Sequence, residues 1–155
     1  MADKKYLVKT GLLYNKAHQW LKQDGDLVSF GLTDFAAKEL GDISLVSLDS
    51  AKGLNVNQVV FEGDDVKTAA IADVSIESSK TVADIYAPVS GTVKEVNVAL
   101  GDSPDLINSK PYDSWLMKIQ ASAWETEKPA LMDANSYKSF VMKVGQVPDA
   151  NVELK

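Results

Sequence analysis

Lys80 stands at the centre of a pattern that is typical of a β-hairpin, and its amine is a candidate for chemistry. Apolar residues alternate with polar ones before it, at Val74 and Ile76, and an apolar residue returns after it at Val82. Small hydroxyl residues fill the expected tip. A lysine at such a tip is open to solvent, and an enzyme could find it and acylate it. The spacing therefore makes Lys80 a candidate attachment point.

Catalysis suits Lys80 less well than modification does. A lysine that works as a base or as a Schiff-base nucleophile needs burial or a cationic neighbour, which favours its neutral form. The two residues that flank it, Ser79 and Thr81, are neither apolar nor basic. A lysine at a turn is also common as a surface residue that protects an exposed strand edge. From spacing alone, this surface role remains the alternative to modification.

Few other residues in the chain could do chemistry. His18 is the single histidine and cysteine is absent, which excludes multi-histidine sites, thiolate metal sites, disulfides and cysteine nucleophiles. Neighbouring carboxylates, such as Asp24 with Asp26 or Asp64 with Asp65, lie at glycine-containing turns, which explain them. No phosphate-binding glycine motif or zinc-spaced cluster occurs. We therefore predict no catalytic residue, no metal site and a structural role for His18.

The composition restricts the class of partner. A chain of 155 residues with 45% hydrophobic content is expected to form one domain around one core. The net charge is −6 and all 16 basic residues are lysines, which disfavours nucleic acid and phosphate ligands. No apolar run is long enough for a signal peptide or a membrane span. We expect a cytoplasmic protein that binds neither nucleic acid nor membrane, although a removed transit peptide would leave no trace.

Strand patterns dominate the elements that must position Lys80. Short strands are expected on both sides of Lys80 and at residues 27–30, 43–48, 58–61, 91–98 and 115–120. Turns that contain glycine and aspartate separate several of them. The sequence therefore predicts a mainly β core.

Helices are expected to be few and peripheral. Thr33 or Asp34 can cap a short helix that Gly41 ends. A capping-box pattern begins at Ser122, and Asp133 can cap a later helix that has one apolar face. These helices are predicted to pack against the core rather than to carry chemistry.

A long stretch around the lysine has a family likeness. Glu77-Ser78-Ser79-Lys80, together with residues 84–97, resembles the lipoylation hairpin of glycine cleavage system H proteins. Residues 14–20, 31–43 and 101–119 resemble further motifs of that family in the same order. The likeness covers residues 11–141 as an H-protein-like lipoyl domain. It leaves an N-terminal extension at 1–10 and a C-terminal extension at 142–155, whose end lacks a clear period and is expected to be loosely attached.

The resemblance implies a fold and a cofactor. The fold is mainly β, a flattened lipoyl/biotinyl-type barrel (barrel-sandwich hybrid) with short peripheral and C-terminal helices. The cofactor is lipoate, attached covalently to Lys80, with Glu77, Ser78 and Ser79 leading to the attachment point. Biotin carriers usually flank the lysine with methionines, and acyltransferase lipoyl domains usually place an aspartate before it. Here Ser79 precedes and Thr81 follows, which favours the H-protein type.

The resemblance also implies a carrier that is not itself an enzyme. Its lipoyl-lysine arm would shuttle a bound intermediate between partner enzymes, as in the aminomethyl transfer of glycine cleavage. The implied partners are a lipoate ligase or lipoyl transferase, which attaches the cofactor, and three enzymes of the cycle. These three are a pyridoxal-phosphate-dependent decarboxylase, a folate-dependent aminomethyltransferase and a dihydrolipoyl dehydrogenase.

Departures from the family pattern leave the cargo open. The family motif places a glutamate after the histidine, where it helps to shelter the loaded arm, but here Gln19 follows His18. A neutral amide loses the charge-assisted part of such a hydrogen bond. Asp84 retains a second acidic position of the family. An H-like lipoate-binding protein that carries sulfur for a heterodisulfide-reductase-like complex is therefore one alternative, and an unmodified β-barrel interaction module is another.

Overall fold

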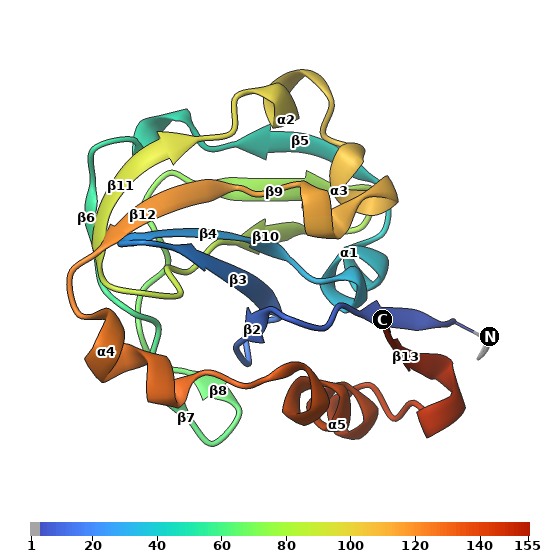
Figure 1. Cartoon of the computed structure of the whole chain (residues 1–155). Helices are drawn as coiled ribbons and strands as arrows, with labels where there is room; N and C mark the ends of the chain where they lie inside the picture. Colours follow the sequence, from blue (N-terminus) through green and yellow to red (C-terminus); the bar gives the residue numbers. More distant parts are fainter. Residues whose placement is uncertain (1–3) are drawn as a thin grey trace.

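Two antiparallel β-sheets form the body of the protein in the computed structural model, which describes residues 4–155 (Figure 1). The larger sheet has the strand order β2-β3-β4-β12-β11-β6. Its strands are β2 (Leu13–Tyr14), β3 (Gln19–Asp24), β4 (Leu27–Leu32), β12 (Met117–Ala121), β11 (Gly91–Val96) and β6 (Asn55–Val56). The smaller sheet consists of β10 (Val82–Asp84), β9 (Ser75–Ser78) and β5 (Ile43–Ser47) in that order. The strands that flank Lys80 are thus β9 and β10, as the alternating pattern predicted.

The main core lies between the two sheets. Phe30 of β4 and Ile119 of β12 point into it from the larger sheet, and Val46 of β5 and Ile76 of β9 point into it from the smaller one. Burial of such a side chain stabilises the fold by about 1.5–3 kcal/mol. The shared core fixes the small sheet, and therefore the Lys80 hairpin, against the rest of the molecule. The two-sheet, mainly β architecture agrees with the flattened barrel that was expected.

Within residues 4–155, five short helices lie around the sheets: α1 (Asp34–Leu40), α2 (Ala99–Asp102), α3 (Leu106–Ser109), α4 (Trp124–Glu127) and α5 (Ala134–Val144). Single 3₁₀ turns occur at Asp49–Ala51, Pro111–Asp113, Lys128–Ala130 and Asp149–Asn151. Thr33 caps α1 by accepting a hydrogen bond from the Ala36 amide, and Gly41 ends that helix. Asp133 caps α5 by accepting from the Ser136 amide. Both helices confirm the capping signals in the sequence.

Two local predictions were wrong. The capping box at Ser122 does not form, since α4 follows Ala123 and has no side-chain cap. Residues 58–61 do not make one strand, because only the last of them belongs to β7 (Phe61–Glu62). The Val59 amide instead donates to the Ala87 carbonyl, outside any ladder. Of the apolar residues in this run only Val59 is buried, and Val60 is 54% exposed, so the apolar run indicates neither a strand nor a continuous buried segment here.

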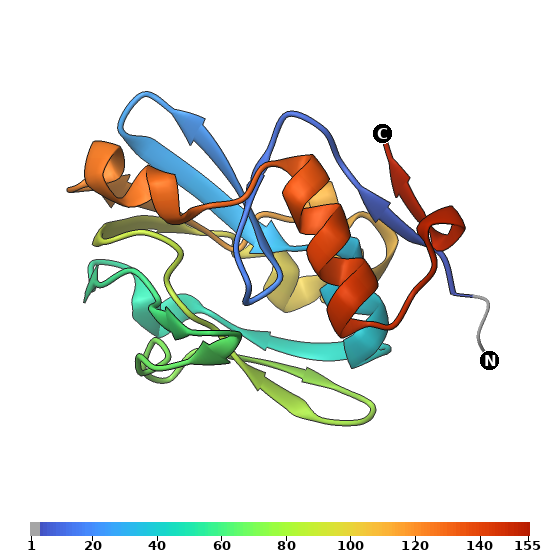
Figure 2. The same ribbon diagram turned by 90° about the horizontal axis from the view of Figure 1, so that it is seen from below.

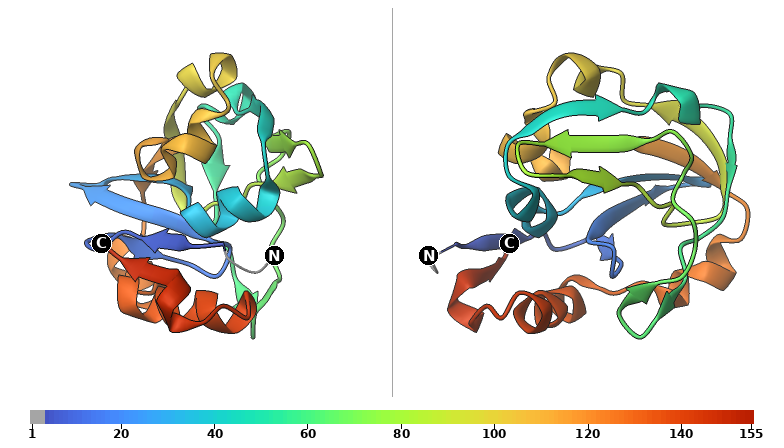
Figure 3. Two further views of the ribbon diagram at one scale, coloured as in Figure 1. Left: turned by 90° about the vertical axis from the view of Figure 1, so that its right-hand side faces the viewer. Right: turned by 180° about the vertical axis from the view of Figure 1, so that it is seen from behind.

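The C-terminal extension is not loosely attached. β13 (Val152–Leu154) pairs in parallel with β1 (Tyr6–Val8), and Val152 is only 2% exposed. The right view of Figure 3 shows the blue N-terminal strand beside the dark red C-terminal strand. Helix α5 also runs past the domain boundary expected at residue 141, as far as Val144. The first three residues of the expected N-terminal extension lie outside the described part of the chain.

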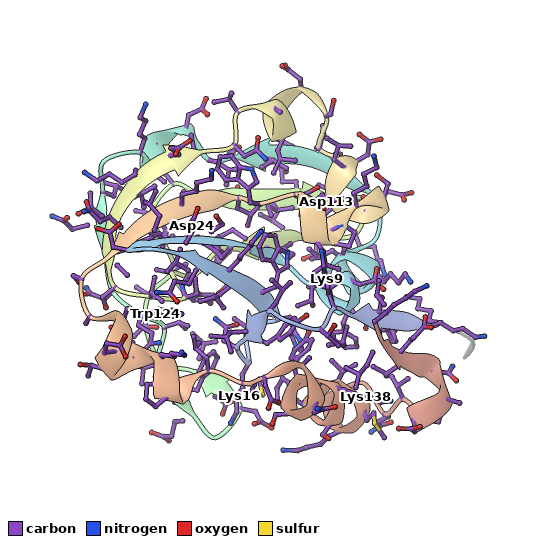
Figure 4. The ribbon with its side chains drawn as sticks, in the orientation of Figure 1. Lys9, Lys16, Asp24, Asp113, Trp124 and Lys138 are labelled. Atoms are coloured by element: carbon purple, nitrogen blue, oxygen red, sulfur yellow. The ribbon has the colours of Figure 1, made fainter. Side chains whose placement is uncertain are left out.

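A second hairpin, β7 with β8 (Asp65–Val66), is held to the helical side of the molecule by charge. Asp64 at its turn pairs with Lys16 at 3.2 Å and with Lys143 of α5 at 3.0 Å. Figure 4 shows Lys16 beside this hairpin and close to α5. Within residues 4–155, no helix has the length and apolar character that a membrane crossing requires.

Candidate functional site

The hairpin tip that carries Lys80 has a defined shape because Ser78 organises it. The Ser78 hydroxyl oxygen accepts hydrogen bonds from the amides of Lys80 and Thr81, each at 3.2 Å. The Ser78 amide donates to the Thr81 carbonyl at 2.8 Å and closes the turn. The Ser79 amide donates to the carbonyl of Asp42 and ties the tip to the residue before β5. Lys80 is therefore exposed on a backbone that is fixed from two sides.

The side chain of Lys80 lies against Gly41, the residue that ends α1. Gly41 has a φ of +85°, and a Cβ atom added to it would lie 2.9 Å from Cε of Lys80. Glycine suits this place for two reasons, because it adopts positive φ without strain and because it leaves room for the lysine. Within residues 4–155, the Lys80 amine has no ion pair and no side-chain hydrogen bond. The amine is thus free to react.

Sequence reasoning missed a residue that positions this contact. The Asn108 side chain, which belongs to α3, bridges the connection between α1 and β5. Its carbonyl oxygen accepts from the Ile43 amide at 2.9 Å, and its amide donates to the Gly41 carbonyl at 2.8 Å. Asn108 therefore holds the surface on which Lys80 lies. The signal was its place in the Gly101–Asn108 family motif, but no local rule links that motif to residue 41.

The other predicted residues of the hairpin lie along its strands and at its tip. Glu77 is half-buried on β9, and it pairs across the strands with Val82. Asp84 is exposed on β10, where it pairs with Ser75. Figure 2 shows the hairpin projecting from the body of the molecule below α1. The structure thus places Glu77 and Ser79 next to the Lys80 tip, whereas Asp84 lies further from it, at the other end of the β9–β10 ladder.

Gln19, the departure from the family motif, is buried and hydrogen-bonded through its side chain. It begins β3, and its side chain is only 1% exposed. Its amide nitrogen donates to the Tyr86 carbonyl at 2.7 Å, and its amide oxygen accepts from the Asn15 side chain at 2.8 Å. The side chain of Gln19 therefore holds the main chain at Tyr86, just beyond β10, and is itself held by the side chain of Asn15. An ionised glutamate at this position has no N–H or O–H group and could not donate the hydrogen bond to Tyr86.

His18 lies against a second cluster of buried side chains, mostly aromatic, to which α1 and α5 contribute outside the main core. Its ring packs against Phe35 of α1 and Phe140 of α5, with ring centroids 4.8 and 5.4 Å away. Burial lowers the pKa of the His18 imidazole to about 4, and the negative charge of Glu39 offsets part of that effect. The backbone of His18 has a φ of +61°, in the left-handed region. The residue is neutral near pH 7 and packs as a structural part of this aromatic cluster.

A chain of hydroxyl groups assigns the tautomer of His18. The Tyr137 hydroxyl lies 2.7 Å from Oγ1 of Thr33 and 2.8 Å from Nδ1 of His18. Oγ1 of Thr33 already accepts from the Ala36 amide. When the Thr33 hydroxyl donates to the Tyr137 oxygen, the Tyr137 hydroxyl is left to donate to Nδ1, and we therefore assign the imidazole proton to Nε2. The chain joins α5 to the N-terminus of α1 and leaves His18 no role as a base at the lysine.

The chemistry open to this site is that of an accessible amine. Within residues 4–155 no group of three or more histidine, cysteine or acidic side chains is placed to hold a metal ion. Lys80 has the exposure and the fixed backbone that an acylation site requires. The residues present therefore fit an acyl group, such as lipoate, in amide linkage to Lys80.

Comparison with known proteins places the chain in a family. The sequence model of the glycine cleavage H-protein matches residues 12–144. A probable glycine cleavage system H protein of Thermococcus gammatolerans is 44% identical over 138 residues, which cover 88% of this chain and 93% of the relative. The glycine cleavage system H protein of Staphylococcus carnosus is 38% identical over 131 residues, which cover 84% of this chain and 94% of the relative.

A solved structure has the same fold. The crystal structure of a glycine cleavage system H protein from Mycobacterium marinum superposes with a TM-score of 0.65 at 30% sequence identity. The superposition covers 86% of this chain and 96% of that one. The family match and the relatives agree with the resemblance carried by the hairpin motif. The chain belongs to the glycine cleavage H-protein family, and it is therefore a lipoyl carrier component rather than a catalyst.

Proposed function

We propose that Lys80 is the lipoyl attachment site and that the lipoylated protein carries aminomethyl groups in glycine cleavage. The observation that supports this most directly is the exposed Lys80 amine on a hydrogen-bonded hairpin tip. The tip lies within the residues that match the family. The proposed partners are a lipoate ligase or lipoyl transferase, the decarboxylase, the aminomethyltransferase and the dihydrolipoyl dehydrogenase of the glycine cleavage system.

The attachment step needs an amine that can approach an activated acyl group. Lys80 loses a proton and its Nζ attacks the carbonyl carbon of lipoyl adenylate. The new bond is a carbon–nitrogen amide bond, and the carbon–oxygen bond to AMP breaks with AMP as the leaving group. The open surface at Gly41 leaves room for this approach.

Bound lipoate supplies a disulfide that can be reduced and can hold a one-carbon unit. The chain supplies the tether, the rigid tip and the charge around it. Glu77 next to the tip and Asp84 further along the hairpin provide negative charge on the surface that leads to Lys80, which favours an amine cargo that is cationic. Gln19 need not supply that charge, because its side chain holds Tyr86 and Asn15. The comparisons support the glycine cleavage client and give no support to a sulfur-carrying client.

Intact-mass analysis tests the attachment site. The protein is incubated with lipoate, ATP and a lipoate ligase, and we expect one lipoyl group per chain. Lys80→Arg keeps the positive charge and should gain none, whereas Lys52→Arg, which changes another exposed lysine, should gain one. Lipoylation of Lys80→Arg would overturn the assignment.

A second measurement tests the client. The lipoylated protein is mixed with glycine and the decarboxylase of a glycine cleavage system, and we expect a glycine-dependent gain in mass on the arm. Protein that carries lipoate on Lys80 but is never loaded in this assay would refute the glycine cleavage client while it left the attachment site standing.

A further inference from the structure

The outer face of the small sheet carries a row of three side chains next to the Lys80 tip. Leu45 of β5 and Val82 of β10 both pair directly with Glu77 of β9. Their neighbours Val46 and Ile76 point into the core, so the row points outward, since side chains alternate along a strand. The right view of Figure 3 shows this sheet towards the viewer, with the larger sheet behind it.

The two apolar side chains of this row, Leu45 and Val82, are both exposed to solvent. Leu45 is 46% exposed and Val82 is 57% exposed. Neighbouring strands lie about 4.8 Å apart, so the two aliphatic side chains stand about 10 Å apart with Glu77 between them. Single exposed apolar residues are ordinary. Two of them in register, on either side of one carboxylate and beside a reactive amine, make a patterned surface.

The charge around the row defines the partner that it fits. Glu77 lies within the row, and Asp42 and Asp84 are exposed nearby, on either side of the hairpin. The whole chain is acidic, with a net charge of −6. A complementary partner presents an apolar groove with basic residues along its edge, because opposite potentials speed encounter and set the register of binding.

The position of the row beside Lys80 selects one partner among those of the proposed function. The enzyme that attaches lipoate must reach the lysine amine itself and therefore has to cover the surface around the tip. Enzymes that act on the loaded arm need only its far end. Given the proposed attachment at Lys80, we propose that the Leu45–Glu77–Val82 row is the docking surface for the lipoate-attaching enzyme, which receives the two aliphatic side chains in an apolar groove edged by basic residues.

The rate of attachment tests this proposal. Val82→Thr keeps the shape of the side chain and removes apolar surface, whereas Leu45→Ser shortens the side chain and removes more of it. With a lipoate ligase, lipoate and ATP, intact-mass time courses give kcat/KM for each protein. We expect each single variant to lower kcat/KM about fivefold and the double variant to lower it by about tenfold or more.

Val98→Thr is the matched control, because Val98 is 70% exposed and lies at the start of α2, outside the small sheet. We expect its kcat/KM to stay within about twofold of wild type. Thermal unfolding of all variants checks that the folds are equally stable. A double variant that accepts lipoate as fast as wild type, or an equal loss in Val98→Thr, would overturn the proposal.

The same proteins separate this proposal from the proposed function. Each is lipoylated to completion with excess ligase and then reduced by dihydrolipoyl dehydrogenase with NADH. We expect the double variant to be reduced at the wild-type rate. An equal slowing of attachment and reduction would overturn the choice of the attaching enzyme as the occupant. A wild-type protein that accepts no lipoate would refute the proposed function itself.

Discussion

The burial of His18 predicts that stability falls when the pH is lowered from 7 to 5. The pKa of the imidazole is about 4 in the fold, against 6.5 for an exposed histidine. The unfolded chain therefore binds a proton in this range that the native protein excludes, and protons favour unfolding. Integration of the linkage relation between these two pKa values gives a loss of about 2 kcal/mol between pH 7 and pH 5.

The window between pH 7 and pH 5 isolates this one residue. The two carboxylates with a lowered pKa, Asp64 and Asp133, start from an ordinary value of 3.8. Their contributions are present above that value and are lost only at lower pH. His18 is also the single histidine of the chain, so its ring protons give one unambiguous NMR signal. That signal should titrate near pH 4.

Urea unfolding at pH 7 and pH 5, followed by tryptophan fluorescence, measures the predicted loss. His18→Asn is the comparison variant, because asparagine tolerates the positive φ of this position and does not titrate. We expect the variant to be less stable than wild type at pH 7, since it loses the aromatic packing, but to lose far less stability on acidification. An equal dependence on pH in both proteins, or an NMR midpoint near 6.5, would refute the reasoning.

Other substitutions test the remaining structural arguments. Gln19→Glu should destabilise the protein by about 2 kcal/mol at pH 8, because an ionised carboxylate cannot donate to the Tyr86 carbonyl. Burial raises the pKa of such a glutamate, so the loss relative to wild type should shrink in urea unfolding at pH 5; an equal loss at both pH values would contradict this. Gly91→Ala should cost more than about 3 kcal/mol, because its Cβ would clash with the Gln120 carbonyl oxygen, and circular dichroism would detect a normal fold if the argument is wrong. Val152→Ala should lower the free energy of unfolding by about 2 kcal/mol, whereas a loose tail would leave the urea midpoint unchanged.

Local signals in the sequence predicted the parts of the fold that local chemistry determines. The Thr33 cap, the Gly41 stop and the Asp133 cap all act within one turn of their own helices. The Lys80 hairpin likewise depends on alternation and on residues at its own tip. The pairing of β1 with β13 could not be predicted, because the two strands lie near opposite ends of the sequence. Neither segment has a residue pattern that indicates which strand it pairs with.

The site was predicted in part for the same reason. Lys80 and its neighbours on the hairpin are contiguous in sequence, so one motif identified them. The contact between Gly41 and Lys80, and the Asn108 side chain that supports it, depend on three segments that meet only in the fold. Leu45 and Val82 are also invisible as a pair until the register of the small sheet is known.

Holding the hairpin in place and carrying negative charge on its surface belong to different residues. Gln19 is buried and holds Tyr86, so it determines where the chain leaves the hairpin. Glu77 and Asp84 place negative charge on the outer face of the hairpin, and this charge does not depend on the residue at position 19. The departure of Gln19 from the family motif therefore bears on how the hairpin is held, through the bond to Tyr86.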